Sequence, residues 1–112
     1  MHYFLLEKNI ELSKLKIDIS LAKNDKDKLC ELIRNSLLIK KPMVELDEWD
    51  RGPRVVFNYG HTFGHAIESV TKFGVPHGIA VAYGIDLANF ISVDRGYLKP
   101  SVRNQIRDIL DN

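Results

Sequence analysis

The sequence predicts an all-α fold, and three observations predict it. Apolar residues recur at spacings of three and four along most of the chain, which is the period of an amphipathic helix. No run of alternating apolar and polar residues bounded by turns indicates a strand. Glycine and proline fall between the periodic stretches, as in the segment Gly-Val-Pro at 74–76, where a helix would end.

The first half of the chain predicts two helices. Residues 1–22 have a mixed apolar pattern that becomes helical in its second half. A stronger helix begins after Asn24 or Asp25, since either residue can act as an N-cap. Pro42 interrupts its pattern, and we expect a kinked or restarted helix to continue as far as Asp50. Cys30 lies in the apolar run of this helix, so a buried structural thiol is expected.

The second half begins at a turn, Arg-Gly-Pro-Arg at 51–54, which is the clearest break in the chain. Residues 55–73 form an apolar segment punctuated by glycines, which we expect to be helical. Residues 77–93 are apolar on nearly every side, and this predicts a helix that is buried all round. A last amphipathic helix is predicted from residue 99 to the end of the chain.

The totals are those of one soluble globular domain. The chain has 112 residues, of which 45% are hydrophobic and 28% charged, and its formal net charge is +1. This balance excludes a function based on bulk attraction to nucleic acid or to an anionic membrane. The stretches free of charged residues are too short to span a bilayer, so a cytoplasmic protein is expected. We expect a single helical domain over residues 1–112 that is part of a larger protein, because so small a chain can hardly surround a helix buried on every side.

The stretch Asn-Tyr-Gly-His-Thr-Phe-Gly-His at 58–65 is the strongest candidate for chemistry. On one continuous helix, Asn58, His61 and His65 would project from the same face. Gly60 and Gly64 would each cost such a helix about 1 kcal/mol relative to alanine. A segment that carries this cost twice indicates close approach, either by another backbone or by a ligand.

His77 completes a group of three histidines. It follows His61 by sixteen residues, across the turn at 74–76, so a helical hairpin would return it to the level of His61. Two histidines at i and i+4 with a third ligand from elsewhere suit zinc or a similar divalent ion. Thr62 stands where the HExxH motif of metalloproteases has glutamate, which argues against peptide hydrolysis by that route. A single histidine on an apolar helix is usually a core residue, but this grouping favours a metal or anion site.

Charged residues near this stretch suit a small anionic substrate. Arg54 and Lys40 lie upstream of the histidines, and arginine suits a carboxylate whereas lysine suits a phosphate. Ordinary surface charge is the alternative interpretation. Asp50 and Glu68 could act as acid or base partners, and Glu68 could instead hold the tautomer of an imidazole.

Residues 40–97 resemble the C-terminal helical domain of 3-dehydroquinate synthase and its sugar-phosphate cyclase relatives. The resemblance rests on Lys40, on two short stretches at 47–50 (Asp-Glu-Trp-Asp) and 52–54 (Gly-Pro-Arg), and on two motifs with matching separation, NYGHTFGHAIE at 58–68 and HGIAVAYG at 77–84. It implies the helical, metal- and substrate-binding part of an enzyme that also has a nucleotide-binding α/β domain.

The resemblance also implies roles for the histidines and for Asn58. His61 and His77 would bind a divalent metal, zinc or cobalt. His65 and Asn58 would contact the phosphate of the substrate.

The same resemblance assigns the upstream residues. Lys40 and Arg54 would hold the substrate carboxylate. Asp50 occupies a position where the family commonly has glutamate. It joins His65 and Lys40 as a catalytic candidate.

The implied reaction is that of a carbon–oxygen lyase in the shikimate route to the aromatic amino acids. NAD would transiently oxidise a hydroxyl of a seven-carbon sugar-acid phosphate, phosphate would be eliminated, and the ring would close by an aldol step. The metal would act as a Lewis acid, and NAD would be bound mostly by a domain absent from this chain. The complete enzyme would be a homodimer, with neither nucleic acid nor membrane as a partner.

Two departures from the family pattern stand out. Ile79 replaces the glutamate of the usual HGEAV motif, which removes a polar contact near the metal. The family's third metal ligand, a glutamate far upstream of Lys40, has no counterpart, because Glu7 and Glu11 lie too close in sequence. We therefore expect the isolated chain to be inactive unless another chain supplies the missing parts.

Two other functions stay open. A metal-dependent polyol or alcohol dehydrogenase has a related fold and also presents histidines, but it gives no reason for Lys40 and Arg54. A non-catalytic helical interaction module derived from the enzyme is the alternative of another class.

Overall fold

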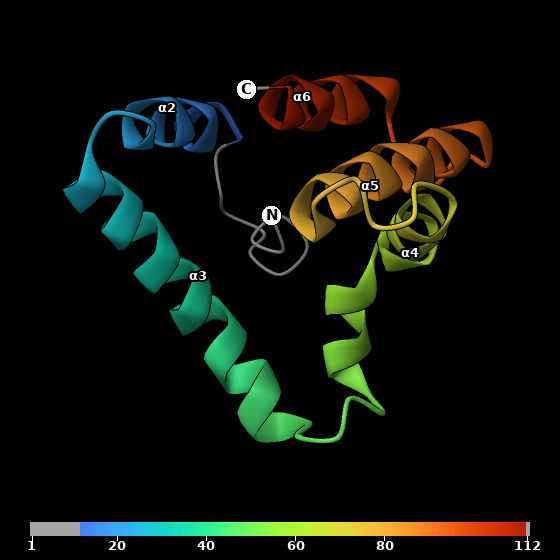
Figure 1. Cartoon of the computed structure of the whole chain (residues 1–112), viewed down its shortest axis with the longest axis horizontal. Helices are drawn as coiled ribbons and strands as arrows, with labels where there is room; N and C mark the ends of the chain where they lie inside the picture. Colours follow the sequence, from blue (N-terminus) through green and yellow to red (C-terminus); the bar gives the residue numbers. More distant parts are fainter. Residues whose placement is uncertain (1–11, 112) are drawn as a thin grey trace. The chain divides into compact units, whose positions relative to one another are not determined.

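The computed structural model describes residues 12–111, and every element of regular structure in this range is a helix (Figure 1). The elements are α2 (Leu12–Ala22), α3 (Lys26–Leu46), the short 3-10 helix η1 (Pro53–Asn58), α4 (His61–Val70), α5 (His77–Asp94) and α6 (Pro100–Leu110). The prediction of an all-α fold is confirmed. The start of the first predicted helix, at 1–11, lies outside the described residues.

The described residues form two compact units, one made of residues 12–57 with residue 111 and the other of residues 58–110. Unit 1 contains α2, α3 and most of η1, and unit 2 contains α4, α5 and α6. The single domain over residues 1–112 stays a prediction. Among residues 12–111, no helix combines the length and apolar character that crossing a membrane requires.

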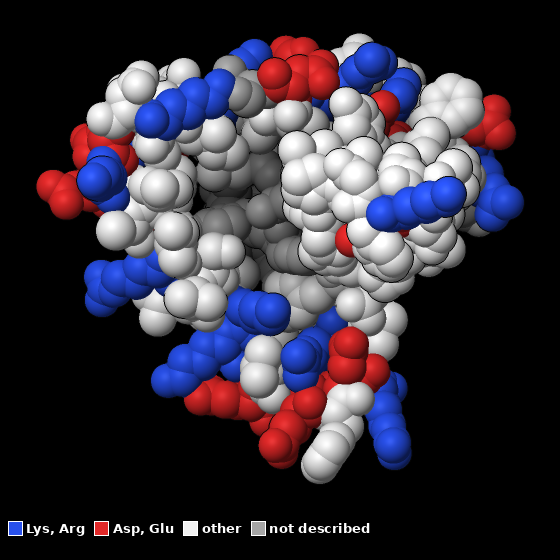
Figure 2. All heavy atoms as spheres, viewed as in Figure 1, with Lys and Arg blue, Asp and Glu red and all other residues white. Residues whose placement is uncertain are grey.

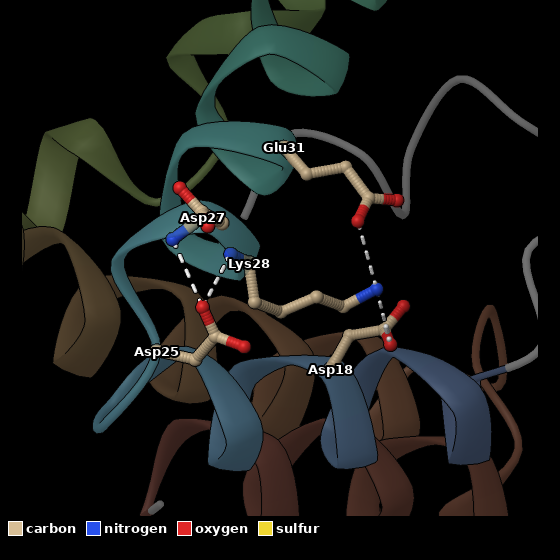
Figure 3. Close-up of polar contacts among 5 residues, drawn as sticks. All are labelled: Asp18, Asp25, Asp27, Lys28 and Glu31. Carbon is tan, nitrogen blue, oxygen red and sulfur yellow. Dashed lines mark hydrogen bonds and ion pairs between the residues drawn. The ribbon is translucent and has the colours of Figure 1, made fainter.

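In unit 1, a cap and a lysine fix the corner between α2 and α3 (Figure 3). Asp25 is the N-cap of α3, and its carboxylate accepts hydrogen bonds from the backbone N–H groups of Asp27 and Lys28 at 2.9 and 3.1 Å. The Lys28 ammonium lies 3.1 Å from the carboxylates of both Glu31 and Asp18. The hydrogen bonds from the Lys28 ammonium to these two carboxylates raise the pKa of Lys28, and the bond to Glu31 contributes most. The cap therefore sets where α3 begins, and Lys28 ties that start to α2.

Helix α3 continues past Pro42 as expected, and it does so as one helix without a restart. Proline removes one backbone donor, but its fixed φ is compatible with a helix, and the neighbouring turns carry the element past it. The helix ends at Leu46, earlier than the predicted Asp50, and the N–H of Asp47 still bonds the carbonyl of Met43 at 3.0 Å.

The apolar stripe of α3 is exposed in the described part of the chain. None of the residues of α3 is buried, Leu37 is 61% exposed, and the predicted buried thiol of Cys30 is exposed as well. Within unit 1 the shorter α2 packs against α3, and eleven residues cannot cover a helix of twenty-one.

In unit 2, α5 packs against both α4 and α6 (Figure 1). Its buried residues form one stripe, namely Ala80, Val81, Gly84, Ile85 and Asn89. The prediction that α5 is buried all round is wrong within this chain, since Tyr83 is 61% and Phe90 57% exposed. Two helices cover only part of a third. In Figure 2, residues other than Lys, Arg, Asp and Glu dominate the visible surface over α4 and α5.

Polar side chains hold the neighbours of α5 in place. The Arg103 guanidinium of α6 donates to both carboxylate oxygens of Asp86, from Nε at 3.2 Å and Nη2 at 3.0 Å, and lies 5.2 Å from the Phe90 ring centroid. On the side of α4, the Tyr59 hydroxyl donates to Asn89 Oδ1 at 2.8 Å. The Arg103 contacts hold α6 against α5, and the Tyr59 hydrogen bond fixes the segment before α4, which leads to the first histidine of the motif.

Candidate metal and phosphate site

Glycines allow the backbones of α4 and α5 to come into contact where the two helices cross. Gly60 is the N-cap of α4 with a left-handed φ of 81°, and Gly64 and Gly84 are buried where the helices cross. A Cβ on Gly84 would lie 2.1 Å from the carbonyl oxygen of Gly60, and one on Gly64 would lie 3.1 Å from the Cα of Val81. The predicted close approach is confirmed, and helix α5 is what approaches these glycines.

Three imidazoles converge on this hairpin. The ring centroids of His61 and His65, on α4, are 5.6 Å apart. The ring of His77, the first residue of α5, lies 5.5 Å from that of His61 and 6.0 Å from that of His65. His61 is half-buried, whereas His65 and His77 are exposed. The hairpin thus returns His77 to the level of His61, as the sixteen-residue separation predicts.

Asn58 does not share a helix with the histidines. It ends η1, and a turn at Tyr59 and Gly60 separates it from α4. The left-handed conformation of Gly60 breaks the helical register at that point. The prediction that Asn58, His61 and His65 lie on one helical face is therefore wrong for Asn58, which is exposed. Its contact with a phosphate stays a prediction.

Glu68 joins the cluster from the third turn of α4. It is buried, and its Oε1 lies 3.0 Å from Nδ1 of His77. The sequence suggests that Glu68 could hold the tautomer of an imidazole, and the structure pairs it with His77.

Two sets of side chains in this cluster could bind a divalent ion as ligands. Imidazole nitrogen is a normal ligand of zinc and cobalt, and the set predicted by resemblance is His61 with His77. A second set consists of His65, Glu68 and His77, whose ligand atoms lie within 4.8 Å of one another. The chemistry of both sets fits the implied metal, and the choice between them stays a prediction. Ile79, two residues after His77, is 50% exposed and offers no ligand atom.

The other predicted site residues belong to unit 1. Lys40 Nζ lies 5.8 Å from the ring centroid of Phe57, a cation–π distance. Asp50 adopts a left-handed φ of 55° in the loop that follows α3. Arg54 Nη1 donates to the carbonyl oxygen of Glu48 at 2.8 Å. The roles of Lys40, Asp50 and Arg54 toward a carboxylate stay predictions.

Asp47 organises the loop that carries Arg54, and the residue pattern alone did not assign it this role. Its carboxylate accepts backbone hydrogen bonds from Arg51 at 3.0 Å, from Gly52 at 2.7 Å and from Arg54 at 3.2 Å. The signal in the sequence is an aspartate upstream of a Gly-Pro turn, since aspartate side chains often bond nearby backbone N–H groups in loops. Asp47 thus holds the loop and the backbone of Arg54.

We expect this loop to loosen in acid. The hydrogen bond from the backbone N–H of Arg51, followed by those from Gly52 and Arg54, holds the pKa of Asp47 below its ordinary value. Because the pKa of Asp47 is lower in the folded chain than in the unfolded one, its ionised carboxylate stabilises the loop fully above the ordinary aspartate pKa of about 3.9. That stabilisation is lost as the pH falls through the lower pKa of the folded chain. The amide proton shift of Gly52, followed by NMR during acid titration, should therefore change below about pH 3.9.

Asp47→Asn is expected to abolish that shift change at Gly52. The amide of Asp27, which bonds the Asp25 carboxylate, serves as a control that Asp47→Asn should leave unaltered. A Gly52 amide that titrates at or above the ordinary aspartate value would contradict the assignment.

Comparisons with known proteins agree with the motifs. Residues 2–112 match a family model described as 3-dehydroquinate synthase C-terminal. The protein named 3-dehydroquinate synthase from Dictyoglomus turgidum is 39% identical over 106 residues, which cover 94% of this chain and 28% of the relative. The one from Campylobacter curvus is 41% identical over 88 residues, which cover 78% of this chain and 25% of the relative. The one from Idiomarina loihiensis is 43% identical over 91 residues, which cover 80% of this chain and 26% of the relative. The chain spans about a quarter of the length of these relatives. No solved structure matches it.

Proposed function

We propose that the chain, which belongs to the 3-dehydroquinate synthase family and matches its C-terminal domain, supplies the metal- and phosphate-binding part of such an enzyme. The complete enzyme would eliminate phosphate from a seven-carbon sugar-acid phosphate and close the ring, as a lyase of the shikimate route. The family match supports this cyclase over a polyol or alcohol dehydrogenase.

The observation that carries the proposal is the convergence of three imidazoles from two helices, with centroids 5.5 to 6.0 Å apart. His61 and His77 would hold a zinc or cobalt ion, each through a neutral nitrogen. A third ligand would come from outside residues 12–111, as the family resemblance implies. Such an ion supplies Lewis-acid polarisation of a substrate oxygen, and NAD supplies the transient oxidation.

His65 and Asn58 would bind the phosphate. His65 is exposed and stands one turn along α4 from His61, so its ring can donate a hydrogen bond to an anion beside the ion. Asn58 would add an amide donor from the end of η1. The leaving phosphate would thus be held by groups that need not bind the metal.

Lys40 and Arg54 would bind the substrate carboxylate, and Asp50 would serve beside them as an acid or base. Arginine presents a planar pair of donors that matches a carboxylate. The loop that Asp47 organises would set the backbone of Arg54 in advance, which limits the entropy lost on binding. NAD, the substrate and a second subunit are the proposed partners of the complete enzyme.

Zinc titration of the 112-residue chain tests the proposal. By calorimetry, the unaltered chain should bind zinc more tightly than about 1 mM. His61→Ala or His77→Ala should each weaken binding at least about 10-fold, because one ligand is lost. His65→Ala should leave zinc affinity within about 2-fold and instead weaken the binding of added inorganic phosphate to the zinc-loaded chain.

Circular dichroism of each variant checks that the helices persist. Loss of zinc binding in His65→Ala but not in His61→Ala would place the ion on the set of His65, Glu68 and His77. Zinc binding that none of the three substitutions alters would contradict a metal site on this hairpin.

A further inference from the structure

Glu68 and His77 face each other where α4 gives way to α5, with Oε1 and Nδ1 3.0 Å apart. We propose that Glu68 is a positioning residue, which fixes the tautomer and orientation of His77 so that Nε2 is left to bind the metal. The inference rests on the proposed role of His77 as a metal ligand. The family resemblance gives Glu68 no such role.

The burial of Glu68 is the first reason. The residue is only 8% exposed, although it lies on a short helix beside an exposed turn. A carboxylate removed from water needs a hydrogen-bond donor, since an unsatisfied buried charge is costly. The side-chain donor that the structure gives it is the His77 ring, which is itself 57% exposed. The pair therefore joins a buried carboxylate to an exposed imidazole.

The chemistry of the two groups sets the tautomer. A carboxylate can only accept a hydrogen bond, so Nδ1 of His77 must carry the proton. In a neutral ring, Nε2 then holds the free lone pair and is the atom that can bind a metal. Carboxylate–histidine pairs of this kind raise the basicity of the ligand and fix the plane of the ring.

The turn before α5 is anchored to the same residue. The backbone carbonyl of Glu68 accepts hydrogen bonds from Phe73 N at 2.7 Å and from the Thr71 hydroxyl at 3.3 Å. Lys72 and Phe73 have left-handed φ values of 52° and 60°, which turn the chain back toward α4. Glu68 thus fixes the path to His77 through its carbonyl and fixes the ring through its carboxylate.

The competing role is that of a direct ligand, with His65 and His77. The Oε1–Nδ1 separation of 3.0 Å is a normal hydrogen-bond distance. An Nδ1 atom that donates this bond cannot also bind an ion. The burial of the carboxylate and the exposure of the ring place the accessible lone pair on Nε2, which favours positioning over ligation.

The test reads the tautomer of His77 directly, without metal. Long-range ¹H–¹⁵N correlation spectra of the labelled 112-residue chain, taken at about pH 8.5, where imidazole is neutral, distinguish protonated from bare ring nitrogens. We expect protonated Nδ1 and bare Nε2 in the unaltered chain. Glu68→Ala should lose this preference, and Glu68→Gln, whose amide oxygen can also accept, should keep part of it.

Glu45→Ala is the matched control. It removes an exposed carboxylate, paired with Lys41 on α3, and should leave the His77 signals unchanged. Protonated Nε2 with bare Nδ1 in the unaltered chain would overturn the proposal, and so would an unchanged tautomer in folded Glu68→Ala. Because the unaltered chain alone can give the overturning result, the test stands even if Glu68→Ala fails to fold.

Zinc affinity supplies the second readout. An orienting partner of this kind is worth about 10- to 100-fold in affinity, so Glu68→Ala should weaken zinc binding by that factor and Glu68→Gln by less. Equal losses in both variants would indicate a direct ligand and overturn the positioning role. If the chain binds no zinc, the proposed metal site fails, while the metal-free tautomer still decides whether Glu68 orients His77.

Discussion

Gly84→Ala is expected to destabilise unit 2 by about 3 kcal/mol, at the upper end of what overpacking costs. The added Cβ would lie 2.1 Å from the carbonyl oxygen of Gly60 and 2.8 Å from the backbone nitrogen of Gly64. Both neighbours are main-chain atoms, so no side chain can rotate away and the helices must separate. Chemical denaturation followed by circular dichroism measures the loss in free energy of unfolding. Zinc affinity should fall with it, because His61 and His77 lie on the two helices that move apart.

Gly78→Ala is the matched control on the same helix. Nothing lies within 4 Å of a Cβ at Gly78, so the substitution should be neutral or stabilising by up to about 1 kcal/mol, the difference in helix propensity. A free energy of unfolding for Gly84→Ala within about 0.5 kcal/mol of that for Gly78→Ala would mean that the helices do not cross at this glycine.

Gly60→Ala is expected to cost a similar amount for two separate reasons. Its φ of 81° is left-handed, which costs a residue with a side chain about 1 to 2 kcal/mol. Its Cβ would also lie 2.5 Å from Cγ1 and 2.7 Å from the backbone nitrogen of Ile85, which adds an overpacking cost of about 1 to 3 kcal/mol. We expect a total of about 3 kcal/mol in the free energy of unfolding, measured by the same denaturation.

Gly96→Ala separates the two contributions. Gly96 has nearly the same φ, 75°, but nothing within 4 Å of its Cβ position. Its substitution should therefore show the conformational cost alone, about 1 to 2 kcal/mol. Equal losses for Gly60→Ala and Gly96→Ala would show that contact with Ile85 adds nothing.

The parts of the site that could be predicted from sequence depend on neighbours along the chain. Helical periodicity and the Gly-Val-Pro turn are local, so the hairpin and the return of His77 to His61 follow from them. The glycine spacing likewise predicted a close approach, although the sequence could not say that a helix, rather than a ligand, fills the space.

The remaining features depend on single conformations or on what covers a surface. One left-handed residue, Gly60, takes Asn58 off the helix of the histidines, and no apolar pattern records that change. The pairing of Glu68 with His77 depends on the left-handed Lys72 and Phe73, which are not residues that usually mark such a turn. The exposure of the apolar stripe of α3 could not be predicted, because the helical period reveals the stripe but not whether another element covers it.

The three histidines and Glu68 lie within one short hairpin, and this bears on how the site comes apart. Only the segment between His61 and His77, sixteen residues apart, must close to bring the imidazoles together, so the loop-closure entropy is small. Contacts so close in sequence open and reform as a local cooperative unit, whose stability differs from that of the whole chain. Hydrogen exchange at the amides of α4 and α5 should therefore slow when zinc is added, because an ion held by His61 and His77 as proposed would join the two ends of that unit.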